Sequence, residues 1–156
     1  MKKLVECVPN ISEGNDQYVI NKIVETVEKY PGIKLLNVDP GKATNRTVIT
    51  FVGDADIIVD AAFKLISKAK ELIDMRKHFG EHPRMGAVDV CPLIPISGIS
   101  MEETVDLAHK LSERVGNELS IPVYCYEYAA KEDKRKNLAN CRAGEYEGLE
   151  NKFNDK

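Results

Sequence analysis

One apolar stripe at helical spacing constrains the fold of this chain more than any other feature. Between positions 57 and 73, apolar residues recur at the spacing of a helix, which predicts a long amphipathic helix with one buried face. The stripe consists of Ile57, Ile58, Ala61, Ala62, Leu65, Ile66, Ala69, Leu72 and Ile73. Residues 46–53, just before it, are rich in β-branched side chains and predict a strand.

Strands and helices alternate through the rest of the chain in an order that indicates one fold class. We expect further strands at residues 4–8, 34–38, 87–96 and 122–126, and further helices near residues 16–30, 100–119 and 131–151. The first six elements follow the βαββαβ series. We therefore predict an α+β fold: a ferredoxin-like βαββαβ core extended by a further strand and helix, with the helices on one face of a mixed sheet.

Several local signals accompany these elements. Residues 12–16 carry helix-start chemistry with Ser12 or Asn15 as the expected N-cap, and Ser100 to Glu103 form a capping box. Asp39-Pro40-Gly41 is a turn signal. The strand at 87–96 contains Pro92 and Pro95, so we expect it to be an edge or bulged strand.

Helices on one side leave the second face of the sheet open. The residues expected to face outward are Val48, Thr50, Val123 and Cys125, or their alternating neighbours. An exposed apolar face of this kind is rarely tolerated in a soluble monomer. We therefore expect another subdomain, or a second copy in a dimer or larger homo-oligomer, to cover it.

Length and composition exclude several classes of protein. The 156 residues suffice for one domain with a real core. The net charge of −3 argues against a nucleic-acid or anionic-membrane partner. No apolar run approaches the roughly 20 residues of a membrane span, and the N-terminus lacks a signal-peptide core. The four cysteines show no CxxC pair, which favours reduced, buried thiols in a cytoplasmic protein.

The segment from residue 74 to residue 91 has the composition of a proton-transfer site. Two of the three histidines, His78 and His82, fall here beside Glu81 and Arg84, on a backbone interrupted by glycine and proline. His82 is then a general acid/base on a rigid loop. The alternative interpretation is a loop histidine that is hydrogen-bonded to a carboxylate for stability.

The same segment fits the zinc-peptidase pattern H-x-x-E-H through His78, Glu81 and His82. That chemistry needs both imidazoles on one helical face. Pro83 pushes His82 out of the helical region, so we expect no metal here. A zinc hydrolase remains a remote alternative.

Further candidate residues lie outside this segment. Asn10 follows the first strand, at an end where ligands gather in open sheets; the alternative is a plain strand-to-helix connection. Asp39 is positioned to orient an imidazole, with ordinary turn chemistry as the alternative. Arg142 is either part of a polar cap or of an anion-binding corner.

Four blocks of sequence carry a further signal: residues 6–14 (ECVPNISEG), 44–53 (TNRTVITFVG), 80–92 (GEHPRMGAVDVCP) and 142–147 (RAGEYE). Together they resemble the N-terminal subdomain of glutamate formimidoyltransferase, the folate enzyme of histidine breakdown. They cover nearly the whole chain in family order. The resemblance implies that residues 1–156 form this subdomain and that the C-terminal subdomain of the family is absent.

The resemblance also implies a reaction: transfer of the formimino group from N-formimino-L-glutamate to N5 of tetrahydrofolate, a co-substrate, without a metal. His82 matches the family's catalytic histidine, and Asp39 is a carboxylate that can fix its tautomer. The candidates for holding substrate or folate are Asn10, Arg46, Glu81, Arg84 and Arg142.

The chain departs from the family in two respects. Glu127 and Tyr128 replace a glycine and an acid of the family pattern, and the chain ends before the family's folate-contacting segment. In the family the folate site is a tunnel between two subdomains. An alternative function is therefore a stand-alone, non-catalytic module that binds folate or a partner chain.

Overall fold

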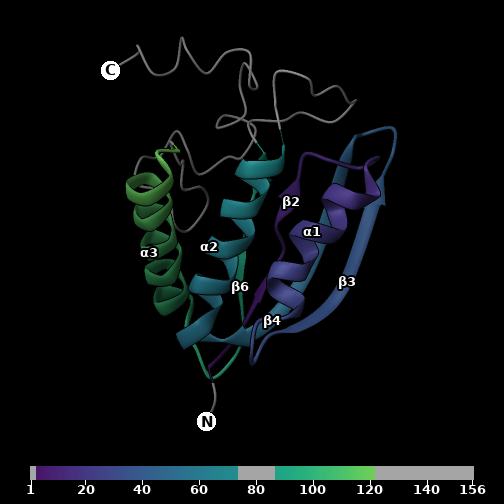
Figure 1. The fold of residues 1–156 in the computed structure, drawn as a ribbon. Helices are drawn as coiled ribbons and strands as arrows, with labels where there is room; N and C mark the ends of the chain where they lie inside the picture. Colours follow the sequence, from purple (N-terminus) through teal and green to yellow (C-terminus); the bar gives the residue numbers. More distant parts are fainter. Residues whose placement is uncertain (1–2, 74–86, 122–156) are drawn as a thin grey trace.

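The computed structural model describes residues 3–73 and 87–121, and within them three helices and six strands (Figure 1). Their order is β1 (Leu4–Cys7), β2 (Asn10–Ile11), α1 (Gln17–Glu28), β3 (Lys34–Gly41), β4 (Arg46–Asp54), α2 (Ala55–Leu72), β5 (Val88–Val90), β6 (Leu93–Ser97) and α3 (Met101–Leu119). The α+β class is confirmed. The strand expected at 122–126 and the helix expected at 131–151 lie outside the described residues.

The strands form one sheet with the connectivity of the ferredoxin-like core. β4 is central: β3 pairs with one edge of it, and β1 and β2 pair in succession with the other. β6 then pairs with β1, and β5 with β2. We expected a mixed sheet, but every pairing in the described part of the chain is antiparallel. Helix α1 joins β1 to β3, and helix α2 leads from β4 toward β6. In both cases the two joined strands run in the same direction, but a strand of opposite direction lies between them: β4 in the first case and β1 in the second.

The expected first and fourth strands are each divided in two. β1 and β2 are separated by Val8 and Pro9, and β5 and β6 by Cys91 and Pro92. A proline cannot donate to a ladder, so pairing is interrupted at these positions. Asp39 and Pro40, expected in a turn, continue β3 instead, and the turn begins after Gly41. Because β3 is paired on one side only among the described strands, the missing N–H of Pro40 is tolerated there.

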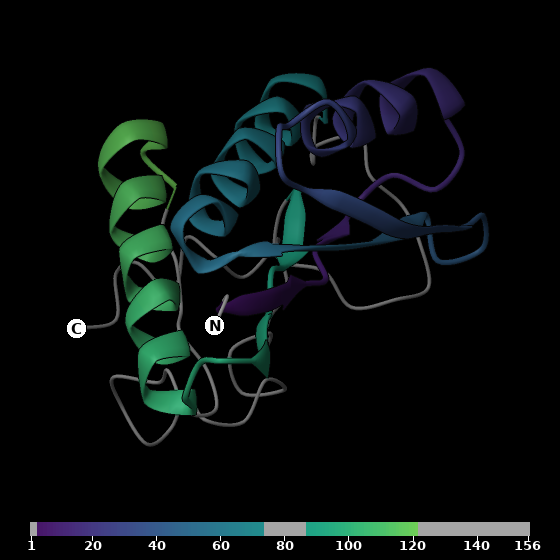
Figure 2. The ribbon, with the colours of Figure 1, turned by 90° about the horizontal axis from the view of Figure 1, so that it is seen from below.

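The core lies between one sheet face and the helices. Along β4, Thr47, Ile49 and Phe51 are fully buried, whereas the residues between them are partly exposed. Val5 and Cys7 of β1 are buried on the same face. Helices α1 and α2 lie across this face, and α3 packs beside α2 near β6 (Figure 2). The apolar stripe of residues 57–73 is the central part of this layer, and Ile58, Ala61, Leu65 and Ala69 are fully buried.

Each helix begins at a side-chain cap. Ser100 and Glu103 form the expected capping box at α3, and Asp54 caps α2. The cap of α1 is Asp16, whose carboxylate accepts from the N–H groups of Tyr18 and Val19, and not Ser12 or Asn15 as expected. The chain between Ser12 and Asp16 is used for another contact, described below. Of the helices that the structure describes, none has the length and apolar character needed to cross a membrane.

Candidate functional site: the open face of the sheet

The face of the sheet opposite α1 and α2 carries three of the predicted site residues. Arg46, Val48, Thr50 and Val52 of β4 alternate with the buried residues and therefore project from this open face. Val48 and Thr50 thus lie on the open face, as expected. Asn10 and Asp39 join it because both are paired directly with Val48, and directly opposed residues project from the same face.

Asn10, Val48 and Asp39 form one row across three strands. Asn10 of β2 is 5 % exposed, whereas Asp39 of β3 is exposed to solvent. Neighbouring strands lie about 4.8 Å apart, so the backbones of Asn10 and Asp39 are separated by about 10 Å. The open face thus carries a buried amide and an exposed carboxylate, with the guanidinium of Arg46 on the same face.

Asn10 and Arg46 are in direct contact. The Oδ1 atom of Asn10 accepts a hydrogen bond from Nε of Arg46 at 2.7 Å and a second one from Nη2 of Arg46. The amide nitrogen of Asn10 donates to the carbonyl oxygen of Val8 at 2.9 Å, which fixes which end of the amide faces the arginine. Because an amide is uncharged, this contact orients the guanidinium without cancelling its positive charge.

The loop before α1 is fastened to the β3–β4 turn beside this pair. Oδ1 of Asn45 accepts from the backbone N–H of Gly14 at 2.9 Å and from Nδ2 of Asn15 at 3.0 Å. Asn45 adopts a φ of 50°, a left-handed conformation that asparagine tolerates better than most residues. We call this contact of residues 13–15 with residues 41–46 the loop–turn clasp.

Gly14 is required in the clasp because of space. A Cβ atom at this position would lie 2.6 Å from the backbone nitrogen of Arg46 and 2.9 Å from its carbonyl oxygen, and closer still to the carbonyl oxygen of Gly41. The clasp therefore brings two backbones together directly next to Arg46. Neither Gly14 nor Asn45 was among the predicted site residues. Both are residue types that favour turns, and they stand in two of the quoted blocks, Gly14 at the end of residues 6–14 and Asn45 within residues 44–53.

The remaining predicted residues are not part of the described structure. Glu81, His82, Arg84 and Arg142 lie outside the described residues, as does His78. The described chain resumes at Ala87, whose carbonyl oxygen accepts from the backbone N–H of Ser12 at 2.8 Å. Ala87 therefore lies beside the end of β2. Residues 3–73 and 87–121 contain no group of three His, Cys, Asp or Glu side chains suited to hold a metal ion, and they do not include the H-x-x-E-H segment.

Cys7 of β1 and Cys91, which lies between β5 and β6, are in contact. The sulfur atoms of Cys7 and Cys91 are 3.5 Å apart, and both thiols are free. Burial raises the pKa of the Cys7 thiol well above its ordinary value, and the contact with Cys91 raises it further. Cys7 is therefore a protonated, inert side chain. The expectation of a buried thiol is confirmed for Cys7, whereas Cys91 is only half-buried; Cys125 and Cys141 lie outside the described residues.

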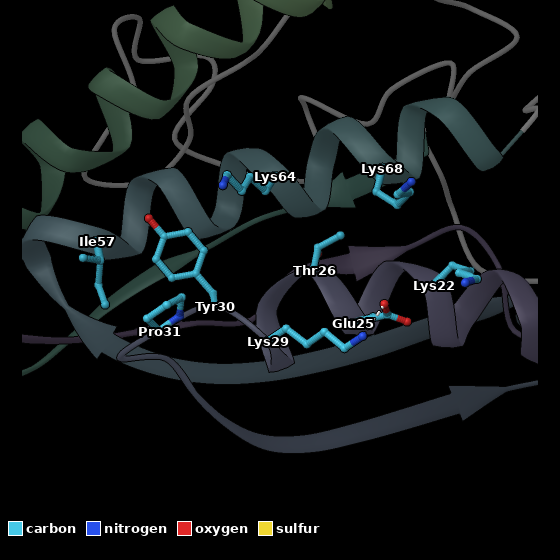
Figure 3. A pocket seen from close by; sticks show the side chains of 9 residues that line it. All are labelled: Lys22, Glu25, Thr26, Lys29, Tyr30, Pro31, Ile57, Lys64 and Lys68. Atoms are coloured by element: carbon cyan, nitrogen blue, oxygen red, sulfur yellow. Dashed lines mark hydrogen bonds and ion pairs between the residues drawn. The ribbon is translucent and has the colours of Figure 1, made fainter.

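A separate groove of about 640 Å³ runs between α1 and α2, on the helical side of the molecule (Figure 3). Its charged lining residues are Lys22, Glu25, Lys29, Lys64 and Lys68. Lys29 is paired with Glu25 at 2.8 Å, Lys64 is 3.9 Å from Asp60, and Lys68 is 3.3 Å from Glu71. These exposed pairs within helices are typical of solvated helix surfaces. The groove shares no residue with the open face.

Comparison with known proteins identifies the family. The model of the formiminotransferase domain, N-terminal subdomain, matches residues 4–156. The chain belongs to this family. It is 53% identical over 153 residues to formimidoyltransferase-cyclodeaminase of Rattus norvegicus, covering 98% of the chain and 28% of the relative.

Shorter microbial relatives carry the name glutamate formimidoyltransferase. The protein of Streptococcus pyogenes is 48% identical over 153 residues, covering 98% of the chain and 51% of the relative. The protein of Thermoplasma acidophilum is 50% identical over 139 residues, covering 89% and 46%. The formiminotransferase family is thus an enzyme family, and the chain spans about half, or less, of the length of these relatives.

Proposed function

We propose that this chain is the N-terminal, catalytic half of a folate-dependent formimidoyltransferase. In this proposal it moves the formimino group from N-formimino-L-glutamate to tetrahydrofolate, with His82 as the general acid/base. The observation that carries the proposal is the close similarity to formimidoyltransferases along residues 4–156. The open face supports it, because Asn10, Arg46 and Asp39 gather there from three strands.

The reaction needs one group that can both accept and donate a proton. N5 of tetrahydrofolate attacks the amidine carbon and must lose a proton as the new C–N bond forms. The bond to the glutamate nitrogen then breaks, and this nitrogen must gain a proton. An imidazole with a pKa near ~6.5 can perform both transfers in turn at neutral pH. We assign this role to His82, and to Asp39 the role of fixing its tautomer.

Arg46 is our first candidate for binding a carboxylate of the glutamate substrate. Guanidinium groups recognise carboxylates through two parallel hydrogen bonds. Arg46 projects from the open face and is held at a fixed place by Asn10. Glu81, Arg84 and Arg142 remain further candidates for contacts to substrate or folate.

We further propose that another domain or a second subunit covers the open face and completes the folate site. The relatives are about twice as long as this chain or longer, so their remaining length is the first candidate, and a second copy of the chain is the alternative. Apolar residues on this face support the proposal: Val48 and Val52 lie there, and Ile94, paired with Glu6, is 39 % exposed. Sedimentation of the chain alone should show a dimer or larger species at micromolar concentration.

The proposed function is tested by adding a separately produced C-terminal subdomain to the chain and measuring release of L-glutamate in the presence of tetrahydrofolate. Transfer should appear in the mixture and be close to absent with the chain alone. His82→Ala should lower turnover by about 10²–10⁴-fold, the usual effect of losing general acid–base help. His109→Ala, on the regular helix α3, is the matched control and should retain the rate. A His82→Ala variant with the wild-type rate would refute the assignment.

A further inference from the structure

We propose that Cys7 and Cys91 form a redox modification site, in which a hydroperoxide oxidises Cys91 and Cys7 then closes a disulfide on it. The proposal does not depend on the proposed function. It rests on three observations: the contact between the two sulfur atoms, their unequal exposure to solvent, and the backbone that surrounds each of them.

The two sulfur atoms are in contact although the residues are far apart in sequence. They lie 3.5 Å apart, and both thiols are free. A disulfide has an S–S distance of about 2.05 Å, so the sulfur atoms must approach each other by only about 1.5 Å. Because the fold holds the two groups together, a bond between them is favoured over a bond with a thiol that must reach Cys91 by diffusion.

The two thiols differ in their access to solvent. Cys7 is fully buried, whereas Cys91 is half-buried at the edge of the core. A hydroperoxide in solution therefore meets Cys91 first. Cys7 is inert toward reagents in solution because they do not reach it, but Cys91 already lies beside it. This assigns the oxidised position to Cys91 and the resolving thiol to Cys7.

The chemistry balances with the hydroperoxide as the oxidant. In the first step a sulfur–oxygen bond forms at Cys91 and the peroxide O–O bond breaks; Cys91 becomes a sulfenic acid, and the thiol proton passes to the departing alkoxide, which leaves as an alcohol. In the second step Cys7 attacks the sulfenic sulfur, the S–O bond breaks, and the proton of Cys7 leaves with the hydroxyl group as water. Burial raises the pKa of the Cys7 thiol, so this second step should be slower than with an exposed thiol.

The backbone around Cys7 is held more firmly than the backbone around Cys91. Cys7 lies in β1, which is paired with β4 on one side and with β6 on the other. Cys91 belongs to no strand and lies in the interruption between β5 and β6. The closing movement should therefore fall on Cys91. The disulfide would fasten the β5–β6 connection to β1, beside the hydrogen bond from the N–H of Val8 to the carbonyl of Pro92.

The test treats the full chain with hydrogen peroxide and identifies its disulfides by peptide mass spectrometry without reduction. Trypsin places Cys7 in residues 4–22 and Cys91 in residues 85–110, so the disulfide joins two peptides that can be recognised by their combined mass. In the native protein this linked pair should exceed every other cysteine pairing at least about tenfold. A reducing dithiol should restore both thiols, and in urea the preference for this pair should disappear.

The matched control is the double variant Cys125→Ser, Cys141→Ser, which keeps only the two proposed cysteines and should form the same linked pair. Cys7→Ala in that background leaves Cys91 without a resolving thiol, so its sulfenic acid should accumulate and be trapped by dimedone; circular dichroism checks that this variant is folded. In Cys91→Ser, Cys7 should stay unmodified. Oxidation of Cys7 at the wild-type rate in this variant would overturn the assigned order of steps.

The crosslink should also raise the melting temperature. It closes a long loop in the unfolded chain, so Tm should rise by about 4–16 °C and return to its former value on reduction. Peroxide-treated Cys91→Ser controls for oxidation of methionine. A linked pair with an unchanged or lower Tm would contradict a fold that accommodates the bond. Conversion of Cys91 to a sulfinic acid without linkage, or linkage to Cys125 or Cys141 instead, would overturn the proposal.

Discussion

The contact between Gly14 and the β3–β4 turn predicts opposite effects for two glycine-to-alanine substitutions. In Gly14→Ala the new methyl group would meet backbone atoms of Gly41 and Arg46, which cannot rotate away as a side chain can. Gly14 is not among the described residues with positive φ, so the obstacle is space and not backbone strain. Forcing an extra carbon into a packed site costs about 1–3 kcal/mol.

Gly116→Ala is the control. Gly116 lies inside α3, is exposed, and an added Cβ would meet only the carbonyl oxygen of Ile121 at an ordinary 3.9 Å. Replacing a helical glycine by alanine should stabilise the protein by about 0.5–1 kcal/mol. The two variants therefore add the same methyl group and should change the stability with opposite signs.

Thermal unfolding followed by circular dichroism measures both effects. For a chain of this size each kcal/mol changes Tm by about 2–4 °C. Gly14→Ala should therefore lower Tm by about 2–12 °C, and Gly116→Ala should raise it by about 1–4 °C. Because the clasp adjoins Arg46, Gly14→Ala should also weaken substrate binding, whereas Gly116→Ala should not. A Gly14→Ala variant as stable as the wild type would refute the steric argument.

Three further predictions concern metal, thiols and acid. If the segment 78–82 holds no zinc, the protein purified without chelator should contain less than one equivalent of zinc and EDTA should leave its Tm unchanged; stoichiometric zinc would contradict this. Because burial raises the pKa of Cys7, iodoacetamide at pH 8 should leave it unmodified in the folded protein and label it in urea, as peptide mass spectrometry can show; rapid labelling of the native protein would contradict its burial. Tyr30 and Arg114 donate hydrogen bonds to Asp60 and hold the pKa of its carboxyl below the ordinary value. A lowered folded pKa means that this stabilisation is present above the unfolded pKa of about 3.9 and is lost as the pH falls through the folded pKa. Asp60→Asn should therefore cost about 1 kcal/mol in urea unfolding at pH 6 and less at pH 3; an equal cost at both would contradict it.

Strong local patterns predicted much of the fold. The apolar stripe of α2 and the β-branched run of β4 are both long, so the local pattern and the tertiary packing favour the same secondary structure there. Local signals failed where the sheet overrode them. Asp39 and Pro40 carry turn chemistry, yet pairing with β4 keeps them extended, and Asp16 caps α1 because Asn15 is used in the clasp.

The residues of the candidate site were named from the sequence, but their contacts were not. Asn10 and Asp39 were selected for their chemistry and their place at a strand end, and Arg46 through the resemblance to the family. That Asn10 binds Arg46 depends on the register of β2 with β4, which a hydrophobic pattern does not determine when the strand has only two residues. The need for Gly14 arises likewise from an approach of two backbones that are distant in sequence, and only the folded structure shows it.

Among the strands that the structure describes, β3 is paired on one side only, and its free edge limits how the sheet can be extended. A sheet edge with regular, unpaired N–H and C=O groups can add a strand from another molecule, which leads to aggregation. Two features of β3 oppose this: its pairing with β4 shifts register between Leu35 and Asn37, and Pro40 has no N–H to donate. Another domain or subunit can therefore lie against the broad surface of the sheet, whereas pairing along this edge of β3 is disfavoured. For the same reason, a strand fused to the protein at this edge should not pair with β3, whereas a fused domain that packs on the surface of the sheet should be tolerated.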